Sequence, residues 1–333
     1  MSSDIGDRQS IRAVLKCLDH RQAACQGEDE IGITFVDLEI EHPPIIAQLD
    51  AYNRLCEYRA LSRYSRMKFC SLQEAVEEYV HDGDEIALEG FTHLIPYAAG
   101  HEIIRQGRKD LALIRMTPDL LYDQMIGVGA ARKLIFSWGG NPGVGSLHRL
   151  RDAVEKGWPR PLEIIEHSHA GMANAYEAGA AGLPCALFRG YRGSDLVKVN
   201  PTIKFINCPF SGEELTLIPS LRPDIAIIHA QKADKQGNVM LEGIVGVQKE
   251  AVLAAKRAIA TVEEIVDDFG PRSTNAVILP YWTLSAVALA PGGAKPSYAH
   301  GYYERDNAFY IAWDEIARDR DTFQTWMREN VLR

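Results

Sequence analysis

From residue 71 onward, short apolar stretches alternate with helical segments, and this alternation constrains the fold more than any other feature. The strand-like stretches are 85–88, 111–116, 133–137, 162–166, 185–188, 225–229 and 258–262. The main helical segments between them are 119–128, 146–156, 168–178 and 247–256. Strands that alternate with helices pair in parallel, and helices then cover both faces of the sheet. The sequence therefore predicts an α/β fold with an open, mostly parallel sheet and helices on both faces.

Two parts of the chain depart from this alternation. Residues 190–223 contain several prolines and glycines and predict a small β-rich excursion, with short strands near 204–206 and 215–218. Residues 1–66 show no strand and helix alternation, and we expect them to be an extension that is poorly ordered or that results from a misplaced start codon. Residues 67–333 are then expected to form one domain that ends in two helices within 303–332.

Composition excludes several classes of protein. The net charge of −9 argues against binding to nucleic acid, which needs clustered lysine and arginine. No apolar run reaches the roughly 18 residues that a membrane helix requires, and no secretory signal is visible. The 6 cysteines include no CxxC pair, so they indicate neither a disulfide framework nor a zinc site. We expect a reduced, cytoplasmic protein without a bound metal.

Loops that follow parallel strands are where such sheets bind ligands, and the first of them is 89–96. Gly90 allows close approach of the backbone, while Thr92 and His93 add polar groups. Backbone amides at such a turn can hold an oxyanion or a phosphate. The competing interpretation is an ordinary tight turn with a solvated His93.

The second loop, 137–148, contains four glycines. Gly143 and Gly145 resemble the start of a dinucleotide fingerprint, but His148 stands where the third glycine belongs, and no acidic residue completes a ribose site. We therefore reject binding of NAD. A non-catalytic protein that binds a nucleotide or sugar phosphate through residues 139–145 remains an alternative hypothesis.

The third loop ends in His167, Ser168 and His169. Two histidines alone do not make a catalytic zinc site, which uses three protein ligands. Ser168 is better interpreted as the N-cap of the next helix, and His169 as a candidate hydrogen-bond donor to substrate. Cys208 would need a neighbouring base to act as a nucleophile, so a buried structural thiol is favoured. No GxSxG, GxxxxGK[ST] or HExxH motif is present, and the chain lacks a complete catalytic set.

Several segments resemble one known family in both order and spacing. They are 87–96, 137–145, 222–230, 234–238, 261–265, 291–294 and 300–306. Together they resemble the A (α) subunits of family I CoA-transferases from about Met67 to the C-terminus. Within that family, the likeness is greatest to α subunits that act on 3-oxoadipate, and next to those that act on glutaconate.

The resemblance implies an enzyme of aromatic-compound degradation that moves CoA from succinyl-CoA to a 3-oxo dicarboxylic acid. In this family the nucleophile is a glutamate of the B (β) subunit, which forms a glutamyl-CoA thioester, so no catalytic nucleophile is expected in this chain. The partner is then a β subunit, commonly in a heterotetramer. Coenzyme A enters as a thioester substrate, and no cofactor is expected to stay bound.

The resemblance also implies roles for individual residues. The loop that faces the partner's glutamate and supplies oxyanion contacts would comprise Gly90, Phe91, Thr92 and His93. Candidates for binding the far end of the substrate are Asn141, Gly143, Gly145, His167, Ser168 and His169. His169, Arg189 or Arg192 would pair with the distal carboxylate. Glu89 lies in the right loop, but the family gives no reason to make it the nucleophile.

A CoA-ester hydrolase of the same fold, acting in steroid-ring degradation, is the second hypothesis. Those relatives use an acidic residue in the segment that corresponds to 166–169. His169 occupies that place in this chain, which counts against hydrolysis.

Overall fold

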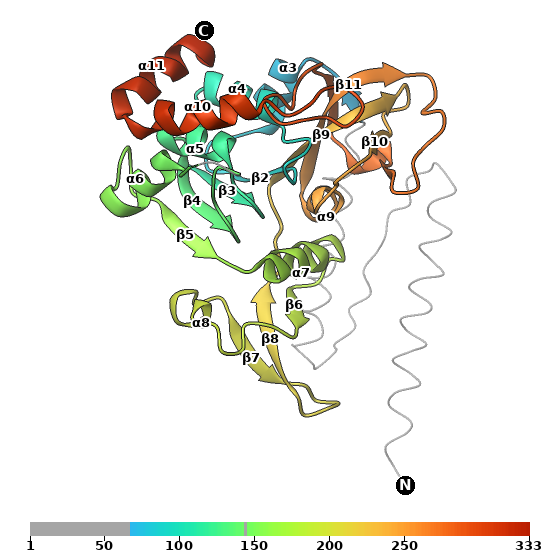
Figure 1. Ribbon diagram of the computed structural model, residues 1–333. Helices are drawn as coiled ribbons and strands as arrows, with labels where there is room; N and C mark the ends of the chain where they lie inside the picture. Colours follow the sequence, from blue (N-terminus) through green and yellow to red (C-terminus); the bar gives the residue numbers. More distant parts are fainter. Residues whose placement is uncertain (1–66, 143–144) are drawn as a thin grey trace, which may run out of the picture. The chain divides into compact units, whose positions relative to one another are not determined.

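The described residues of the computed structural model, 67–142 and 145–333, are built around a ten-stranded sheet (Figure 1). Its strand order is β1-β13-β11-β9-β2-β3-β4-β5, and every neighbouring pair in this order is parallel. In chain order these strands are β1 (Lys68–Phe69), β2 (Glu85–Glu89), β3 (Leu111–Arg115), β4 (Ala131–Phe136), β5 (Glu163–Glu166), β9 (Ile225–Asp234), β11 (Arg257–Val266) and β13 (Ala286–Leu289). Two further strands, β10 (Val239–Leu241) and β12 (Val277–Leu279), pair antiparallel beside β9. The predicted mostly parallel sheet is confirmed.

Helices cover both faces of this sheet. Successive strand residues point to opposite faces, so Leu113 joins one hydrophobic cluster and Ile114 joins the other. The first cluster packs under α3 (Leu72–Tyr79), α4 (Tyr97–Arg105), α5 (Leu120–Gly127), α6 (His148–Lys156), α10 (Asn307–Arg318) and α11 (Arg320–Asn330). The second packs under α7 (His169–Ala180) and α9 (Gln248–Ala254). The strands are therefore buried on both sides, which explains why they read as continuous apolar runs.

The predicted helix signals are present in the structure. Ser71 caps α3 and Glu74 reaches back to it, as the capping box requires. The chain ends in α10 and α11, so the prediction of two closing helices is confirmed. Two short elements complete the set, α8 (Leu196–Val199) and the 3₁₀ turn η1 (Tyr281–Thr283). Within the described residues, no helix is both long and apolar enough to cross a membrane.

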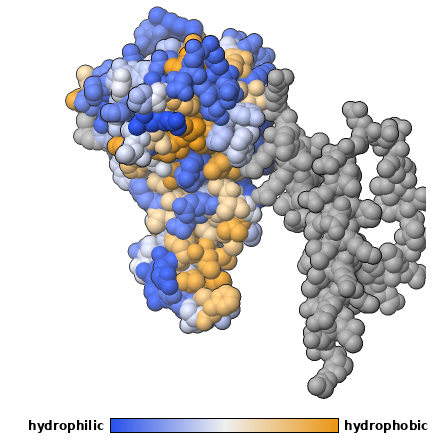
Figure 2. All heavy atoms as spheres, turned by 90° about the vertical axis from the view of Figure 1, so that its right-hand side faces the viewer, coloured by the Kyte–Doolittle hydropathy of each residue, from blue (hydrophilic) through white to orange (hydrophobic). Residues whose placement is uncertain are grey.

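The β-rich excursion forms a separate three-stranded antiparallel sheet of β6 (Cys185–Phe188), β8 (Glu214–Pro219) and β7 (Lys204–Asn207). The prediction was wrong for 185–188, which we expected in the parallel sheet. Only Ala186 of this strand is buried, and an antiparallel sheet with one solvated face accommodates such a strand. The excursion therefore begins at Cys185. Figure 2 shows apolar side chains at the lower end of the molecule, where Leu187, Phe205 and Phe210 are exposed.

Two sequence predictions fall outside the described residues. They are the nature of the extension over 1–66 and the role of Gly143. The described residues all belong to one compact unit of the chain.

Candidate functional site

The loop that follows β2 is tightly folded and conformationally strained. A Cβ atom on Gly90 would lie 2.7 Å from the carbonyl oxygen of Leu94, so only glycine fits there. Thr92 and Leu94 have φ angles of 57° and 53°, in the left-handed region that residues with a side chain rarely adopt. Such strain persists only where the surrounding structure holds it.

Two later segments of the chain hold this loop. The backbone N–H of His300 donates to Nε2 of His93 at 2.9 Å, and Nδ1 of His93 lies 3.1 Å from the carbonyl oxygen of Ile244. The Ser297 hydroxyl donates to the carbonyl oxygen of Thr92 at 2.9 Å. The loop is therefore bound on both sides by residues from β10 onward.

The His93 side chain is a fixed part of this framework. It is completely buried, and burial lowers its pKa to about 4. Because Nε2 accepts the His300 N–H, the neutral ring carries its proton on Nδ1 and donates it to Ile244. The competing interpretation of a solvated His93 is wrong. Its imidazole has no free nitrogen to offer a substrate.

The backbone of the same loop does offer free donors. Within the described part of the chain, the N–H groups of Phe91 and Thr92 have no hydrogen-bond acceptor. Both residues are only half-buried. Two fixed N–H groups at a strand-to-helix turn form the kind of site that stabilises a developing oxyanion.

Glu89 lies beneath the loop and supports it. Its side chain is nearly fully buried, and Oε1 accepts the Tyr176 hydroxyl at 2.7 Å and the Met116 N–H at 3.1 Å. Burial raises its pKa, although the nearby Arg115 opposes that shift. Arg115 in turn donates to the carbonyl oxygen of Gly90 at 2.8 Å. A carboxyl group enclosed in this way positions the loop and is not placed to attack a substrate.

The predicted third loop meets the first one. The rings of Phe91 and His169 are edge-on, with centroids 6.4 Å apart. His169 is the first residue of α7 and is exposed, while Ser168 caps the helix by accepting the Gly171 N–H at 3.0 Å. The prediction that Ser168 is an N-cap is confirmed. An exposed imidazole therefore lies near the half-buried residue Phe91.

His167 has a different environment from His169, its neighbour but one. It is buried, and its Nδ1 lies 3.1 Å from the Tyr191 hydroxyl. Burial lowers its pKa to about 4. The Asn200 amide donates to the carbonyl oxygen of Glu166 at 2.8 Å and tightens the same junction. His167 therefore joins the excursion to the main sheet and is not at the exposed surface of the site.

The glycine-rich loop packs against α10. The Asn141 side-chain amide donates to the carbonyl oxygen of Tyr310 at 2.7 Å, and a Cβ on Gly145 would lie 2.1 Å from Oδ1 of Asp314. His148 also contacts that carboxylate, at 2.9 Å. Gly145 therefore allows α10 to pack closely against this loop. Within the described residues, no hydrogen bond or ring contact links Asn141 or Gly145 to loop 90–93.

The two arginine candidates are already paired in the excursion. Arg189 donates to both carboxylate oxygens of Glu213 at 2.7 Å, and Arg192 lies 3.3 Å from Glu214. Neither is brought to loop 90–93 by any contact of the described residues. The expectation of a buried thiol at Cys208 is wrong, because this residue is only partly buried.

Comparison with known proteins identifies the family of this chain. The family model described as Coenzyme A transferase matches residues 69–290. The chain belongs to the coenzyme A transferase family. It is 71% identical over 261 residues to the α (A) subunit of the 3-oxoadipate CoA-transferase of Pseudomonas knackmussii, a match that covers 78% of this chain and 92% of that protein.

A second member of the family supplies a solved structure. The chain is 34% identical over 284 residues to the α (A) subunit of the glutaconate CoA-transferase of Acidaminococcus fermentans, covering 80% of this chain and 88% of that protein. The crystal structure of glutaconate coenzyme A-transferase from the same organism matches with a TM-score of 0.74 and 33% identity, over 80% of this chain and 89% of that chain. The predicted family is therefore confirmed.

One part of the candidate site was missed by sequence reasoning, the loop 242–247 after β10. A Cβ on Gly243 would lie 2.9 Å from Cε1 of His93, and one on Gly246 would lie 2.9 Å from the Cβ of Phe91. Both glycines have positive φ angles, 90° and 61°. Between them Ile244 is 49% exposed and offers an apolar surface beside the loop. The only signal was the Gly-x-x-Gly spacing, which by itself indicates no more than a turn.

The described residues contain no group of three or more histidine, cysteine, aspartate or glutamate side chains arranged to hold a metal ion. What the site presents is two backbone donors, an exposed imidazole and an apolar rim. The carboxyl group of Glu89 beneath the loop is enclosed.

Proposed function

We propose that this chain is the α subunit of a two-component 3-oxoadipate CoA-transferase that moves CoA from succinyl-CoA to a 3-oxo dicarboxylic acid. The observation that carries the proposal is the 71% identity to the α subunit of a 3-oxoadipate CoA-transferase over 92% of that protein's length. We further propose that the β subunit is the partner, in a heterotetramer.

The enclosed carboxyl group of Glu89 supports a division of labour between the two subunits. In the proposed reaction, a glutamate carboxylate from the β subunit first attacks the thioester carbonyl of succinyl-CoA, and CoA leaves as a thiolate. The thiolate then attacks the glutamyl carbonyl of the resulting anhydride, which releases succinate and leaves a glutamyl-CoA thioester. The carboxylate of the acceptor acid next attacks this thioester and displaces the CoA thiolate, which gives a second mixed anhydride. The thiolate then attacks the acceptor's carbonyl group in this anhydride, which forms the new acyl-CoA and releases the glutamate carboxylate. All atoms come from the two substrates and the glutamate.

The α subunit contributes to these steps through its backbone. Each attack on a carbonyl group places negative charge on the carbonyl oxygen. The N–H groups of Phe91 and Thr92 are fixed and unoccupied by other described residues, and they would donate to that oxygen. A single donor of this type contributes roughly 3–4 kcal/mol to the stability of a transition state. Gly90 and His93 fix the loop from which these donors point.

We propose that His169 binds the distal carboxylate of the acceptor acid. It is exposed and lies against Phe91, while Arg189 and Arg192 are paired with glutamates in the excursion. Its imidazole would donate to the distal carboxylate, and the apolar rim of Phe91 and Ile244 would contact the methylene chain. Asn141 and Gly145 are not assigned to substrate, because α10 occupies them.

A reconstitution experiment tests the proposal. The chain is produced together with the β subunit, and thioester exchange from succinyl-CoA is measured with 3-oxoadipate, glutaconate and acetoacetate. We expect the highest kcat/KM with 3-oxoadipate and no exchange by this chain alone. A preference for glutaconate would identify the sister activity, and loss of thioester without an acceptor acid would identify a hydrolase.

Trapping of the covalent intermediate tests the division of labour. Borohydride reduces a glutamyl-CoA thioester, and peptide mapping then locates the modified glutamate. We expect this glutamate to belong to the β subunit. Modification of Glu89 instead would overturn the assignment of the nucleophile to the partner.

A further inference from the structure

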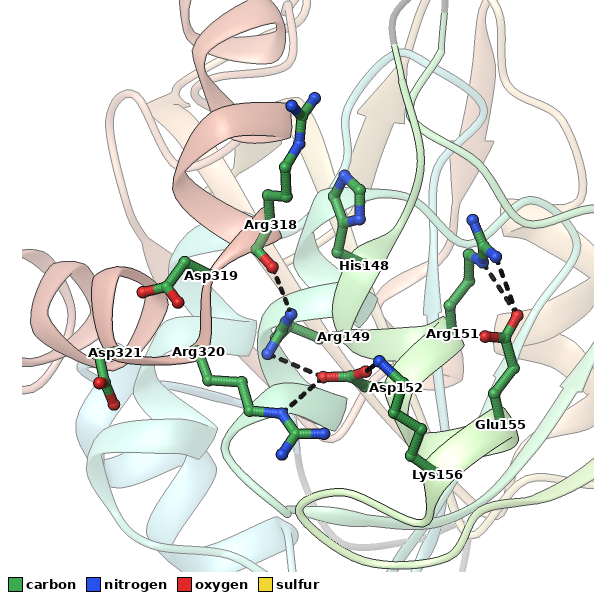
Figure 3. Close-up of a pocket in the computed structure, with 10 residues that line it drawn as sticks. All are labelled: His148, Arg149, Arg151, Asp152, Glu155, Lys156, Arg318, Asp319, Arg320 and Asp321. Atoms are coloured by element: carbon green, nitrogen blue, oxygen red, sulfur yellow. Dashed lines mark hydrogen bonds and ion pairs between the residues drawn. The ribbon is translucent and has the colours of Figure 1, made fainter.

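A polar cavity of about 520 Å³ lies outside the proposed transfer site, where α6 meets the junction of α10 and α11 (Figure 3). Charged side chains line it almost completely, and most belong to these three helices. Its centre is the carboxylate of Asp152, which three cations approach: Arg320 at 2.8 Å, Lys156 at 3.0 Å and Arg149 at 3.2 Å.

These four groups carry excess positive charge. Three cations and one carboxylate sum to 3 − 1 = +2. The hydrogen bond from Arg320 lowers the pKa of Asp152 to about 2, so this carboxylate stays ionised and is still outnumbered. Three other acids line the cavity: Glu155 pairs with Arg151, Asp319 caps α11, and Asp321 lies in the first turn of α11. Apart from His148, the whole lining has five cations and four acids, so its net charge is 5 − 4 = +1.

Arg149 is built into the cavity wall with unused donors. Its side chain is only 2% exposed, and its Nη2 atom donates to the carbonyl oxygen of Arg318 at 3.2 Å. Its Nε and Nη1 atoms are buried and have no hydrogen-bond partner among the described residues, although Nη1 lies in ion-pair range of Asp152. The Arg149 guanidinium lies 5.0 Å from the Trp158 ring and 5.7 Å from the Phe323 ring. A buried guanidinium with unsatisfied donors is costly unless a further acceptor completes it.

The same indole also orients the second arginine. The Arg320 guanidinium lies 4.8 Å from the Trp158 ring and uses only its Nε atom to bond Asp152. Its terminal nitrogens have no acceptor in the described part of the chain, and in Figure 3 they point away from Asp152 and Arg149. The Trp158 ring lies against both guanidinium groups and limits their movement.

We propose that this cavity binds a phosphate group, with Arg149, Arg320 and Lys156 as its ligands. A phosphate has several acceptor oxygens and up to two negative charges, which suit the unused donors of Arg320 and the excess positive charge of the lining. The site is separate from loop 90–93, and its occupation would tie α6 to α11. Free phosphate and the phosphate of a larger metabolite share this chemistry.

Calorimetry with inorganic phosphate on the full chain tests the site. Sodium chloride is added so that every solution has the same ionic strength. This is needed because salt screening by itself weakens interactions between surface charges. We expect saturable binding of one phosphate. Arg320→Gln removes one guanidinium and should weaken binding at least about tenfold, in line with the typical strength of a charged hydrogen bond. Arg189→Gln, in the excursion, is the matched control and should bind like the original chain.

Asp152→Asn separates a binding site from a purely structural ion-pair network. Removal of the competing carboxylate raises the local charge, so phosphate should bind this variant more tightly than the original chain. Phosphate should also raise the Tm of Asp152→Asn by more than it raises the Tm of the original chain. Phosphate binding that does not saturate, or that is unchanged in Arg320→Gln, would overturn the proposal. So would an Asp152→Asn chain that folds and binds phosphate no better.

A competition experiment distinguishes the two sources of the phosphate. CoA and dephospho-CoA, which lacks the 3′-phosphate, are each titrated against bound inorganic phosphate. This arm rests on the proposed function, whereas phosphate binding itself is measured without any transferase assay. Displacement by CoA alone assigns the site to its 3′-phosphate, and displacement by neither supports a free phosphate.

Discussion

The Phe91 ring meets the His169 imidazole edge-on, with centroids 6.4 Å apart and ring planes at 79°. Phe91 follows β2 and His169 begins the helix after β5, and two strands separate β2 from β5 in the sheet. The contact therefore spans the carboxyl edge of the sheet and places an exposed imidazole near the free N–H groups of the first loop.

Replacement of His169 by alanine tests its assignment to the distal carboxylate. The loss of one hydrogen bond to a charged group should raise the KM for 3-oxoadipate about tenfold or more, with little change in Tm, because the side chain is exposed. Steady-state kinetics of the reconstituted enzyme measure this effect. Acetoacetate has no distal carboxylate, so its KM should not change. His81→Ala, at an exposed position before β2, is the control, and an equal loss with both acids would refute the assignment.

Gly90→Ala tests the geometry of the strained loop. The added Cβ would lie 2.7 Å from one backbone oxygen and 2.9 Å from another, neither of which belongs to a flexible side chain. The loop must therefore shift, and a displaced oxyanion donor typically lowers kcat about 100-fold or more. The control is Gly139→Ala, whose nearest neighbour is the end of the Leu150 side chain at 3.3 Å. Near-normal kcat in Gly90→Ala would show that loop 90–93 does not take part in the reaction.

Glu89→Gln tests whether the buried carboxyl group positions the loop or carries the reaction. A glutamine oxygen can still accept the Tyr176 hydroxyl and the Met116 N–H, so we expect a change in unfolding free energy within about 1 kcal/mol and retained exchange activity. Glu89→Ala leaves those donors unpaired and should destabilise the chain by about 1–3 kcal/mol. Urea unfolding and the exchange assay measure both variants. Complete loss of activity in a folded Glu89→Gln chain would identify Glu89 as a catalytic residue.

Sequence reasoning was strongest where local patterns decide the structure. The parallel strands were visible as apolar runs because helices bury both of their faces, and the Ser71 and Ser168 caps were visible because capping depends on nearby residues. It failed at 185–188, where the choice of partner strand is a matter of tertiary packing.

The candidate site was only partly predictable for a similar reason. Loop 90–93 was found because Gly90 follows a strand, but His93 owes its burial to Ile244 and His300, which are more than 150 residues away in the sequence. The glycines of 139–145 gave a misleading signal, because Gly145 makes room for Asp314 of α10. A glycine indicates close approach, and the sequence does not say whether a ligand or a helix makes that approach.

The buried histidines predict how stability depends on pH. His93 and His167 have pKa values of about 4, below the usual 6.5. Between these values the unfolded chain binds protons that the folded chain does not, so stability should fall as the pH falls from 6.5 to 4. Asp123, whose pKa burial raises to about 6, acts in the opposite direction because its contribution is lost as the pH rises. Burial also raises the pKa of Glu89 and lowers the pKa of His101. Three histidines then oppose two carboxyl groups, and a net loss of stability on acidification is expected.

Variants isolate the histidine contribution from that of Asp123. The midpoint of urea unfolding is measured at pH 7 and pH 5 for the original chain, for His93→Gln and for His167→Gln. Each variant should be less stable than the original chain at pH 7. Its midpoint urea concentration should nevertheless fall less between pH 7 and pH 5, because the histidine that takes up a proton on unfolding is gone. His81→Gln, at an exposed histidine, should keep the original pH dependence. If both buried-site variants kept it as well, the acid sensitivity would have to come from other groups.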